Sequence, residues 1–372
     1  MEREQRTLES WAHTYPRDSR PHGLLAGFAA TSTGKYELSV AEAAKSIALE
    51  PDGPRAPEYK GKALSELYLN RLADAEATIR QATERKIENP EFFLVRYLIA
   101  LLNGDRGDMT RQAALARSKP ATEDIISHIE ALVLSRSGRL QEARRASAVA
   151  VEIAMQKRQR ERAALFEAAT AVSEAFYGNA AAARQRAGNA LALARGREVD
   201  YAAAFALALV GDLNRSQALS DDLAKNLPED TSVQYMYLPT LRALFALNAG
   251  DAATAIQSLQ IASRFDLAVG GIGYNGRFGA LYPVYVRGQA YLAIHRPADA
   301  AAEFQRILDH RSIVLADPLD AIARLQLGRA LAMAGDKKKA SAAYENLLGL
   351  WVDADSDIPI LAQAKAEYAR LR

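Results

Sequence analysis

The sequence predicts an all-α solenoid of about nine helix-turn-helix pairs, closed at its carboxy-terminal end by a capping helix. Residues 321–348 read as one such pair, and the same pattern returns along the chain at intervals of about 34 residues. At 372 residues the chain exceeds what one compact core usually holds, whereas a stack of repeats buries each pair against its neighbours. We therefore expect one elongated superhelix in which only neighbouring pairs make contact.

The stretch 321–348 shows the pair most clearly. Apolar residues fall at helical spacing around Gly328, Gly335 then marks a turn, and a second apolar stripe follows with Ala340 and Tyr344. A glycine at position 328 lets the two helices come close together. We expect Tyr344 to fill the space beside it, between neighbouring pairs.

Small or apolar residues recur at the position of Gly328 in earlier parts of the chain. They are Gly27, Ala63, Tyr97, Ala131, Ala171, Ala204, Ala243 and Gly288. Some steps between them lie close to a 34-residue unit, and the longer steps predict longer connections. This spacing, with a small and an aromatic residue in the second helix, resembles the tetratricopeptide repeat (TPR). The resemblance implies a right-handed superhelix whose first helices line its concave surface.

Three regions follow from this pattern. Residues 1–20 read as a single helix, either a capping helix or a partial repeat whose natural chain continues upstream. Residues 21–349 form the TPR array. In residues 350–372 we expect a final capping helix, with Asp357 accepting backbone N–H bonds at its start and Pro359 in its first turn.

Composition excludes several classes of function. The 47 basic and 45 acidic residues give a formal net charge of +2, which favours neither nucleic acid nor an anionic membrane as a partner. The absence of cysteine excludes disulfides and thiol chemistry. The charged amino terminus lacks the apolar run of a signal peptide, and no apolar stretch is long enough to span a bilayer. We expect the chain as given to be soluble, in the cytoplasm or the periplasm.

The sequence offers no candidate for catalysis. Its five histidines are far apart and show no metal-ligand spacing, and no nucleophile elbow or P-loop occurs. We therefore predict no catalytic residue, no metal and no cofactor, and a non-enzymatic protein-interaction or sensor module. A protein or peptide partner would bind the concave surface.

Tyrosine and arginine gather at the inward-facing positions of the later pairs. Tyrosine combines a large rigid contact area with a polar tip, which suits a peptide groove. The candidate groove residues are Tyr201, Tyr237, Arg242, Tyr282, Tyr285, Arg287, Gln289 and Arg329. The alternative is that some of these tyrosines pack between helices.

Two stretches leave other functions open. The loop 269–283 contains Gly271-x-Gly273-x-x-Gly276, so a small-ligand-binding module is one alternative, although the dinucleotide fingerprint requires a preceding strand and here a helix precedes it. Residues 136–162 hold eight basic and three acidic residues. They form either the solvated outer face of helices or a surface for an acidic peptide. A structural or self-associating scaffold is the remaining alternative.

Three segments resemble a narrower family. They are residues 8–18 (LESWAHTYPRD), 281–292 (LYPVYVRGQAYL) and 348–371 (LGLWVDADSDIPILAQAKAEYARL). They are similar to the carboxy-terminal TPR arrays of bacterial receptor-like serine/threonine protein kinases. The resemblance implies a sensor or docking arm behind a kinase domain, tethered to the inner membrane in a longer natural protein. This sequence itself contains no Asp-Phe-Gly motif, and His310-Arg311 is followed by serine instead of the catalytic aspartate.

Overall fold

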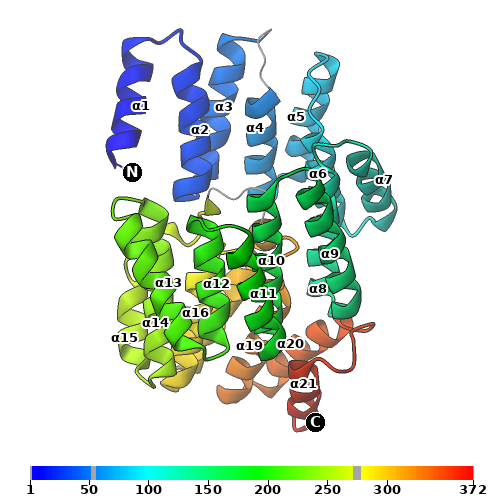
Figure 1. Ribbon diagram of the computed structural model, residues 1–372, viewed down its shortest axis with the longest axis vertical. Helices are drawn as coiled ribbons and strands as arrows, with labels where there is room; N and C mark the ends of the chain where they lie inside the picture. Colours follow the sequence, from blue (N-terminus) through cyan, green and yellow to red (C-terminus); the bar gives the residue numbers. More distant parts are fainter. Residues whose placement is uncertain (1, 52–55, 271–277, 372) are drawn as a thin grey trace. The chain divides into compact units, whose positions relative to one another are not determined.

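The computed structural model describes residues 2–51, 56–270 and 278–371, and in these ranges the chain forms helices and turns without a strand (Figure 1). Nine helix pairs follow one another within the described ranges. Their first helices are α2 (Arg20–Thr33), α4 (Ala56–Tyr68), α6 (Glu91–Asn103), α8 (Glu123–Arg136), α10 (Arg160–Phe176), α12 (Arg197–Leu209), α14 (Leu238–Asn248), α16 (Tyr282–Ala293) and α19 (Leu319–Met333). Their second helices are α3 (Tyr36–Leu49), α5 (Leu72–Glu84), α7 (Arg106–Arg117), α9 (Leu140–Gln156), α11 (Ala180–Leu193), α13 (Leu213–Asn226), α15 (Ala252–Leu259), α17 (Pro297–Asp309) and α20 (Lys337–Leu350). The predicted TPR-like solenoid of about nine pairs is confirmed, and every predicted anchor lies in a first helix.

The remaining helices stand outside the nine pairs. They are α1 (Glu2–Thr14), the π-helical η1 (Val233–Tyr237), the 3₁₀-helical η2 (Ser263–Phe265), α18 (Arg311–Val314) and α21 (Pro359–Ala369). The π-helix η1 runs directly into α14, and α18 occupies the connection between α17 and α19. Both therefore fall where the longer repeat steps predict longer connections.

The helix pairs fall into two compact units. Unit 1 comprises Met1–Ile126 with Leu267–Gly271, and unit 2 comprises Ser127–Asp266 with Ile272–Arg372. In unit 1 the segment that begins at Leu267 contacts the turn between α2 and α3. There the hydroxyl of Tyr36 donates a hydrogen bond to the carbonyl of Leu267. Gly34 in that turn has φ +66°, and a Cβ there would lie 2.6 Å from the backbone of Leu267. A side chain at position 34 would therefore block the contact.

Several turns carry the capping chemistry that the sequence indicates. The helices α7, α15 and α20 begin after Asp105, Asp251 and Asp336, and each carboxylate accepts a hydrogen bond from the amide three residues later. Such N-caps typically contribute about 1 kcal/mol each. A glycine with positive φ precedes each aspartate and ends the previous helix. A glycine-aspartate dipeptide therefore marks each of these three turns between the helices of a pair.

The anchor glycines lie where the two helices of a pair come closest. A Cβ at Gly288 would lie 2.6 Å from the ring of Phe304, and one at Gly328 would lie 2.9 Å from the ring of Tyr344. In both pairs a large ring on the second helix occupies the space that glycine leaves on the first. The expected role of Gly328 is confirmed, and Gly288 plays the same role one pair earlier.

Replacing Gly288 with alanine is expected to lower the free energy of unfolding of unit 2 by about 1–3 kcal/mol, because the new methyl group overpacks against Phe304. Gly27 is the matched control in α2, since no described atom lies within 4 Å of a Cβ built there. Gly27→Ala should stabilise its helix by about 0.5–1 kcal/mol. Urea unfolding of both variants measures the difference, and a Gly288→Ala protein as stable as the wild type would contradict the packing.

Unit 2 closes on itself, so the expectation that only neighbouring pairs touch is wrong there. The ring of Phe176 on α10 contacts that of Tyr285 on α16, with centroids 5.3 Å apart. Arg136 at the end of α8 pairs with Asp320 on α19 at 2.8 Å. Both α10 and α12 are rich in alanine and buried on nearly every side. Small side chains let these first helices approach one another across the middle of the unit.

The chain after α20 continues through a segment of turns, Trp351–Pro359, which we call the C-terminal strap. It leads into α21, where Pro359 occupies the first turn as expected. The prediction that Asp357 caps this helix is wrong: Ile358 stands at the N-cap, and no described side chain caps it. The helix α21 packs on the end of the array through Glu367, which accepts hydrogen bonds from Arg329 and from Tyr344 at 2.8 Å each.

Candidate functional site

The four predicted groove tyrosines come together in unit 2. Tyr201 on α12 stacks on Tyr237 of η1, with ring centroids 3.9 Å apart and planes inclined by 6°. Tyr282 and Tyr285 on α16 each meet the ring of Phe176 edge to face, at 5.5 and 5.3 Å. The sequence pattern therefore identified residues that share one place in the fold.

These tyrosines fill the interior of the unit, where the sequence predicted that they line a groove. Their exposed fractions lie between 1% and 7%. Burial raises the pKa of Tyr282 well above its usual value and that of Tyr285 to about 12, so both phenols stay neutral near pH 7. The physical reason is the approach of α10 and α12 to α16, which leaves the rings facing each other. We refer to the four tyrosines with Phe176 and Phe205 as the aromatic interior.

A hydrogen bond fixes the position of Tyr282. Its hydroxyl donates to Oδ2 of Asp317 at 3.0 Å, and Oδ1 of the same carboxylate accepts the amide of Leu319 at 2.8 Å. Asp317 is itself buried. A buried carboxylate that receives both bonds links α16 to the start of α19, which is a structural role.

Arg287 lies in a buried ion cluster and does not face a groove. Its guanidinium binds Asp266 at 2.8 Å and Glu303 at 2.7 and 2.9 Å, and Arg306 reaches Asp266 at 2.8 Å. The side chains of Asp266 and Arg287 are 0% and 8% exposed. Burial raises the pKa of the Asp266 carboxyl, and it outweighs the opposing effect of the two arginines. The cluster therefore holds α16, α17 and the segment after η2 together.

The other three predicted groove residues do not form one site. Gln289 on α16 is half-buried, and its Nε2 has no hydrogen-bond partner among the described atoms. Arg329 is engaged with Glu367 of α21. Arg242 on α14 is exposed and makes no hydrogen bond or ion pair with any residue that the structure describes. Among the predicted groove residues, all of which the structure describes, Arg242 is the one arginine whose guanidinium is free to bind a ligand.

Sequence reasoning missed the partners that bury the tyrosines. Phe176 and Phe205 belong to the aromatic interior, and Asp266 belongs to the ion cluster, yet none stands out in the sequence. The one available signal was composition, because an alanine-rich first helix such as α12 predicts close approach on several faces. That signal indicates burial but does not name the partner helix.

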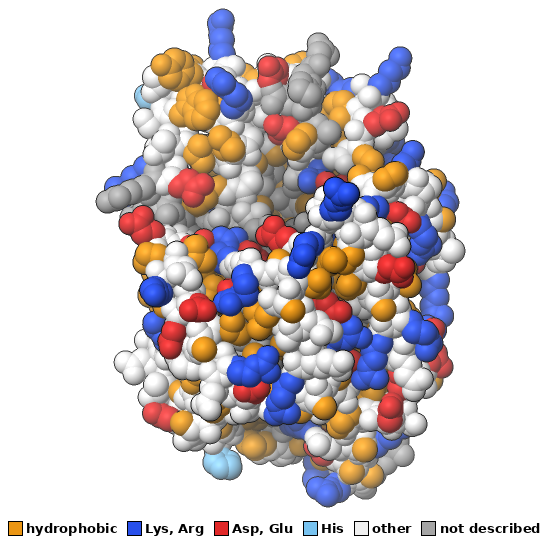
Figure 2. Space-filling model, in the orientation of Figure 1, with side chains coloured by type: hydrophobic (Ala, Val, Ile, Leu, Met, Phe, Trp, Pro, Cys, Tyr) orange, Lys and Arg blue, Asp and Glu red, His pale blue; other side chains and the backbone are white. Residues whose placement is uncertain are grey.

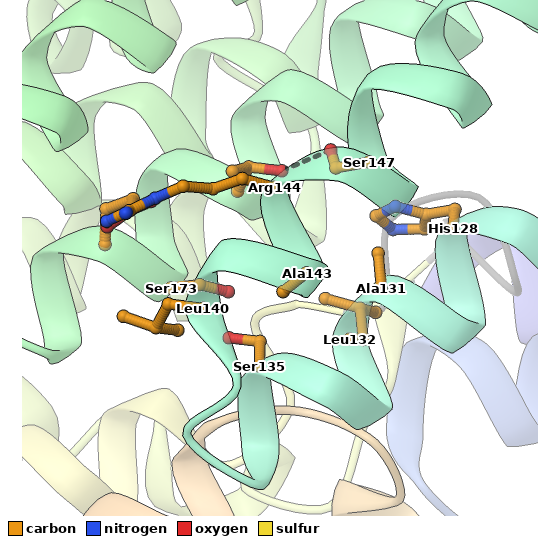
Figure 3. Close-up of a pocket in the computed structure, with 11 residues that line it drawn as sticks. His128, Ala131, Leu132, Ser135, Leu140, Ala143, Arg144, Ser147 and Ser173 are labelled. Carbon is orange, nitrogen blue, oxygen red and sulfur yellow. Dashed lines mark hydrogen bonds and ion pairs between the residues drawn. The ribbon is translucent and has the colours of Figure 1, made fainter. Parts of the chain in front are cut away.

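A small polar recess lies between α8, α9 and α10 (Figure 3). His128 stacks on Phe166 at 4.3 Å, while the side chain of Arg144 points away from it and binds Glu174 at 2.6 and 2.8 Å. The free volume is about 20 Å³, which suits one or two water molecules and is too small for a metabolite. The recess is therefore not a metabolite site.

Other ligand classes find little support in the part of the chain that the structure describes. No group of three or more histidine, aspartate or glutamate residues there could hold a metal ion. None of the described helices has both the length and the apolar character of a membrane span. On the face seen in Figure 2, basic side chains lie among acidic ones. Residues 271–277 of the glycine-rich loop, and with them Gly271, Gly273 and Gly276, lie outside the described residues.

Comparison with known proteins identifies the repeats. Residues 60–123 and 285–356 match the family described as tetratricopeptide repeat. These two stretches cover α4 to α7 and α16 to α20, where the sequence pattern and the observed helix pairs agree. The chain therefore contains TPR repeats. No curated protein matches the sequence significantly.

Two solved structures resemble the chain loosely. The crystal structure of yeast Tom70 has 13% sequence identity and a TM-score of 0.39, with 100% of this chain and 92% of that chain covered. The TPR domain of P58(IPK) has 13% identity and a TM-score of 0.26, with 99% and 92% covered. The repeat assignment rests on the family match and on the helix pairs themselves.

Proposed function

We propose that this chain is a non-enzymatic protein-interaction module and that a partner binds the inward-facing side of α2 and α4. The repeat pattern assigns one register position of each first helix to the inner face. The residues at this position are Leu24, Lys60, Leu94, His128, Ala168, Tyr201, Thr240, Tyr285 and Leu325. Leu24 is 53% exposed and the Lys60 side chain 29%, whereas the other seven, all described, are buried. This contrast is the observation that carries the proposal.

The surface around Leu24 and Lys60 has the chemistry of a docking face. Leu24 offers an apolar side chain to solvent, and Lys60 pairs with Glu91 at 3.0 Å in a half-exposed position. Gly27 and Gly61 present bare backbone, because no described atom lies within 4 Å of a Cβ at either position. A partner main chain can therefore come close to both helices. The fitting partner is a peptide segment with an apolar side chain and a charged neighbour.

Site-specific photo-crosslinking tests this surface. A photoreactive amino acid at position 24 is expected to capture a partner in cells that express the full chain. The same group at Ala44, an exposed position on α3, is the matched control and should capture far less. Equal capture at both positions, or none at position 24, would contradict the proposed docking face.

We also propose that the module serves a bacterial signalling protein of the receptor-like serine/threonine kinase type. The resemblance of residues 8–18, 281–292 and 348–371 to the TPR arrays of such kinases supports this context. Sequencing the reading frame upstream of Met1 in the source genome is the test. A kinase or DNA-binding domain in frame is the expected result, and an independent start at Met1 would contradict it.

A further inference from the structure

The C-terminal strap, Trp351–Pro359, lies along the surface of unit 2 and is held by a few anchors. Trp351 and Ile358 are buried, whereas Val352 is 78% exposed and Asp353, Ser356 and Asp357 are also exposed. The indole ring of Trp351 meets Tyr177 at the end of α10 edge to face, at 5.3 Å. The strap therefore contacts unit 2 through two buried apolar residues and folds into turns between them.

The turn between α8 and α9 is shaped to receive this segment. The indole N–H of Trp351 donates to the carbonyl of Arg136, and the amide of Asp355 donates to the carbonyl of Gly138, both at 3.0 Å. A Cβ at Gly138 would lie 2.6 Å from Ala354 and 3.3 Å from the indole ring. Only a residue without a side chain leaves room for the strap at this point.

Asp355 also supplies a cap that α9 lacks in its own sequence. An aspartate side chain caps three of the second helices, α7, α15 and α20, whereas α9 begins after Arg139, whose side chain makes no capping bond. The carboxylate of Asp355 accepts the amide of Gln141, in the first turn of α9, at 2.7 Å. An anion at this helix end is also favoured by the helix dipole. The strap thus places an acidic group at the start of α9, as the capping aspartates do at the starts of α7, α15 and α20.

The charges around the strap are complementary. The pKa of Arg139 is raised first by its bond to Glu142, and the charges of Asp353 and Asp355 raise it further. The pKa of Arg144 is raised first by its bond to Glu174, and Asp357 and Asp355 contribute in the same way. These strap aspartates face arginines at the surface, where salt screens the attraction. The charged part of the contact should therefore depend on salt, whereas its apolar part depends on the buried side chains of Trp351 and Ile358.

We propose that the turns at Arg136–Gln141 and Tyr177–Gly178 form a docking site for an acidic segment with an aromatic residue four positions before an aspartate. The C-terminal strap is its intramolecular occupant, and a partner segment of the same chemistry displaces it. The carbonyls of Arg136 and Gly138, the amide of Gln141 and the ring of Tyr177 supply the contacts. None of these residues belongs to the surface proposed on α2 and α4, so each surface is tested by itself.

A peptide binding experiment on the full chain tests the site. A fluorescent peptide with the sequence of residues 350–360, LWVDADSDIPI, is titrated with the wild type and with a Trp351→Ala/Asp355→Asn variant. The variant should bind at least tenfold more tightly, because in the wild type the intact strap competes at an effective concentration on the order of millimolar. A control peptide carrying the same two substitutions should not bind. Raising the salt from about 50 to 500 mM should weaken binding.

Circular dichroism shows whether the variant is folded. If the variant is unfolded, hydrogen exchange of the wild-type protein tests the proposal instead. In the wild type, the amide of Asp355 should exchange at least tenfold faster than amides in the middle of α10, because the strap opens without global unfolding. Two results overturn the proposal. One is a folded variant that does not bind the peptide, and the other is an Asp355 amide that exchanges only as slowly as α10.

Discussion

Replacing Tyr282 with alanine is expected to lower the free energy of unfolding of unit 2 by about 3–5 kcal/mol, the range for removing a large buried aromatic side chain. Tyr282 is 1% exposed, touches Phe176 and Phe205, and donates to Asp317. The substitution removes the ring contacts and the hydrogen bond together. Urea unfolding followed by circular dichroism provides the measurement.

Two control variants separate the causes. Tyr15→Ala removes a ring that is 61% exposed and should change stability by no more than about 0.5 kcal/mol. Tyr282→Phe keeps the ring and loses the bond to Asp317, so its cost should be about 1 kcal/mol. A Tyr282→Ala protein of wild-type stability that fails to bind a partner would show that this tyrosine lines a groove.

Replacing Arg287 with methionine should cost about 3 kcal/mol or more, because it breaks a buried ion cluster by removing one partner. Asp266 would retain only Arg306, and Glu303 would lose both of its bonds to Arg287. Burial opposes the charge of Arg287, but its bonds to Glu303 and Asp266 outweigh this effect and raise its pKa. Thermal and urea unfolding of the variant measure the loss.

Arg242→Met is the matched control for this cluster. Arg242 comes from the same predicted groove, is exposed, and has no ionic partner among the described residues. Its substitution should change stability by no more than about 0.5 kcal/mol. Equal losses at positions 242 and 287 would contradict the assignment of Arg287 to the core.

The sequence was sufficient to predict the repeats, because their signals are local. Gly328 and Tyr344 are sixteen residues apart on two helices of one pair, and the glycine-aspartate turn between those helices fixes their register. The same spacing of sixteen residues separates Gly288 from Phe304 in the preceding pair, where Gly288 is a predicted anchor. Each of these signals depends only on contacts within one repeat.

The site was harder to predict, because its contacts join repeats that are far apart in the sequence. Each helix pair is rotated slightly relative to the one before it, and the accumulated rotation from α10 to α16 determines whether Phe176 contacts Tyr285. No local sequence pattern predicts that accumulated rotation. Tyr201 and Tyr285 occupy the register position that the repeat pattern assigns to the inner face, but register does not distinguish an open concave face from a filled one. Burial of the aromatic interior therefore had to be read from the structure.

The C-terminal strap illustrates the same limit. The sequence predicts a local cap for the final helix at Asp357 and assigns no distant contact to Asp355. The structure instead places Asp355 on α9, more than two hundred residues earlier in the chain. No local signal distinguishes α9, because α3, α5, α11 and α17 also begin after a residue other than aspartate. The bond from Gln141 to Asp355 is therefore visible only in the structure.

Tyrosine nitration of the native protein, mapped by mass spectrometry, tests the central claim most directly. We predict rapid modification of Tyr15, which is exposed, and protection of Tyr201, Tyr237, Tyr282 and Tyr285 until unit 2 unfolds. That result would show that the aromatic interior of unit 2 is closed. Modification of Tyr282 and Tyr285 as fast as Tyr15 in the folded protein would contradict a closed aromatic interior and would support an open groove lined by these tyrosines.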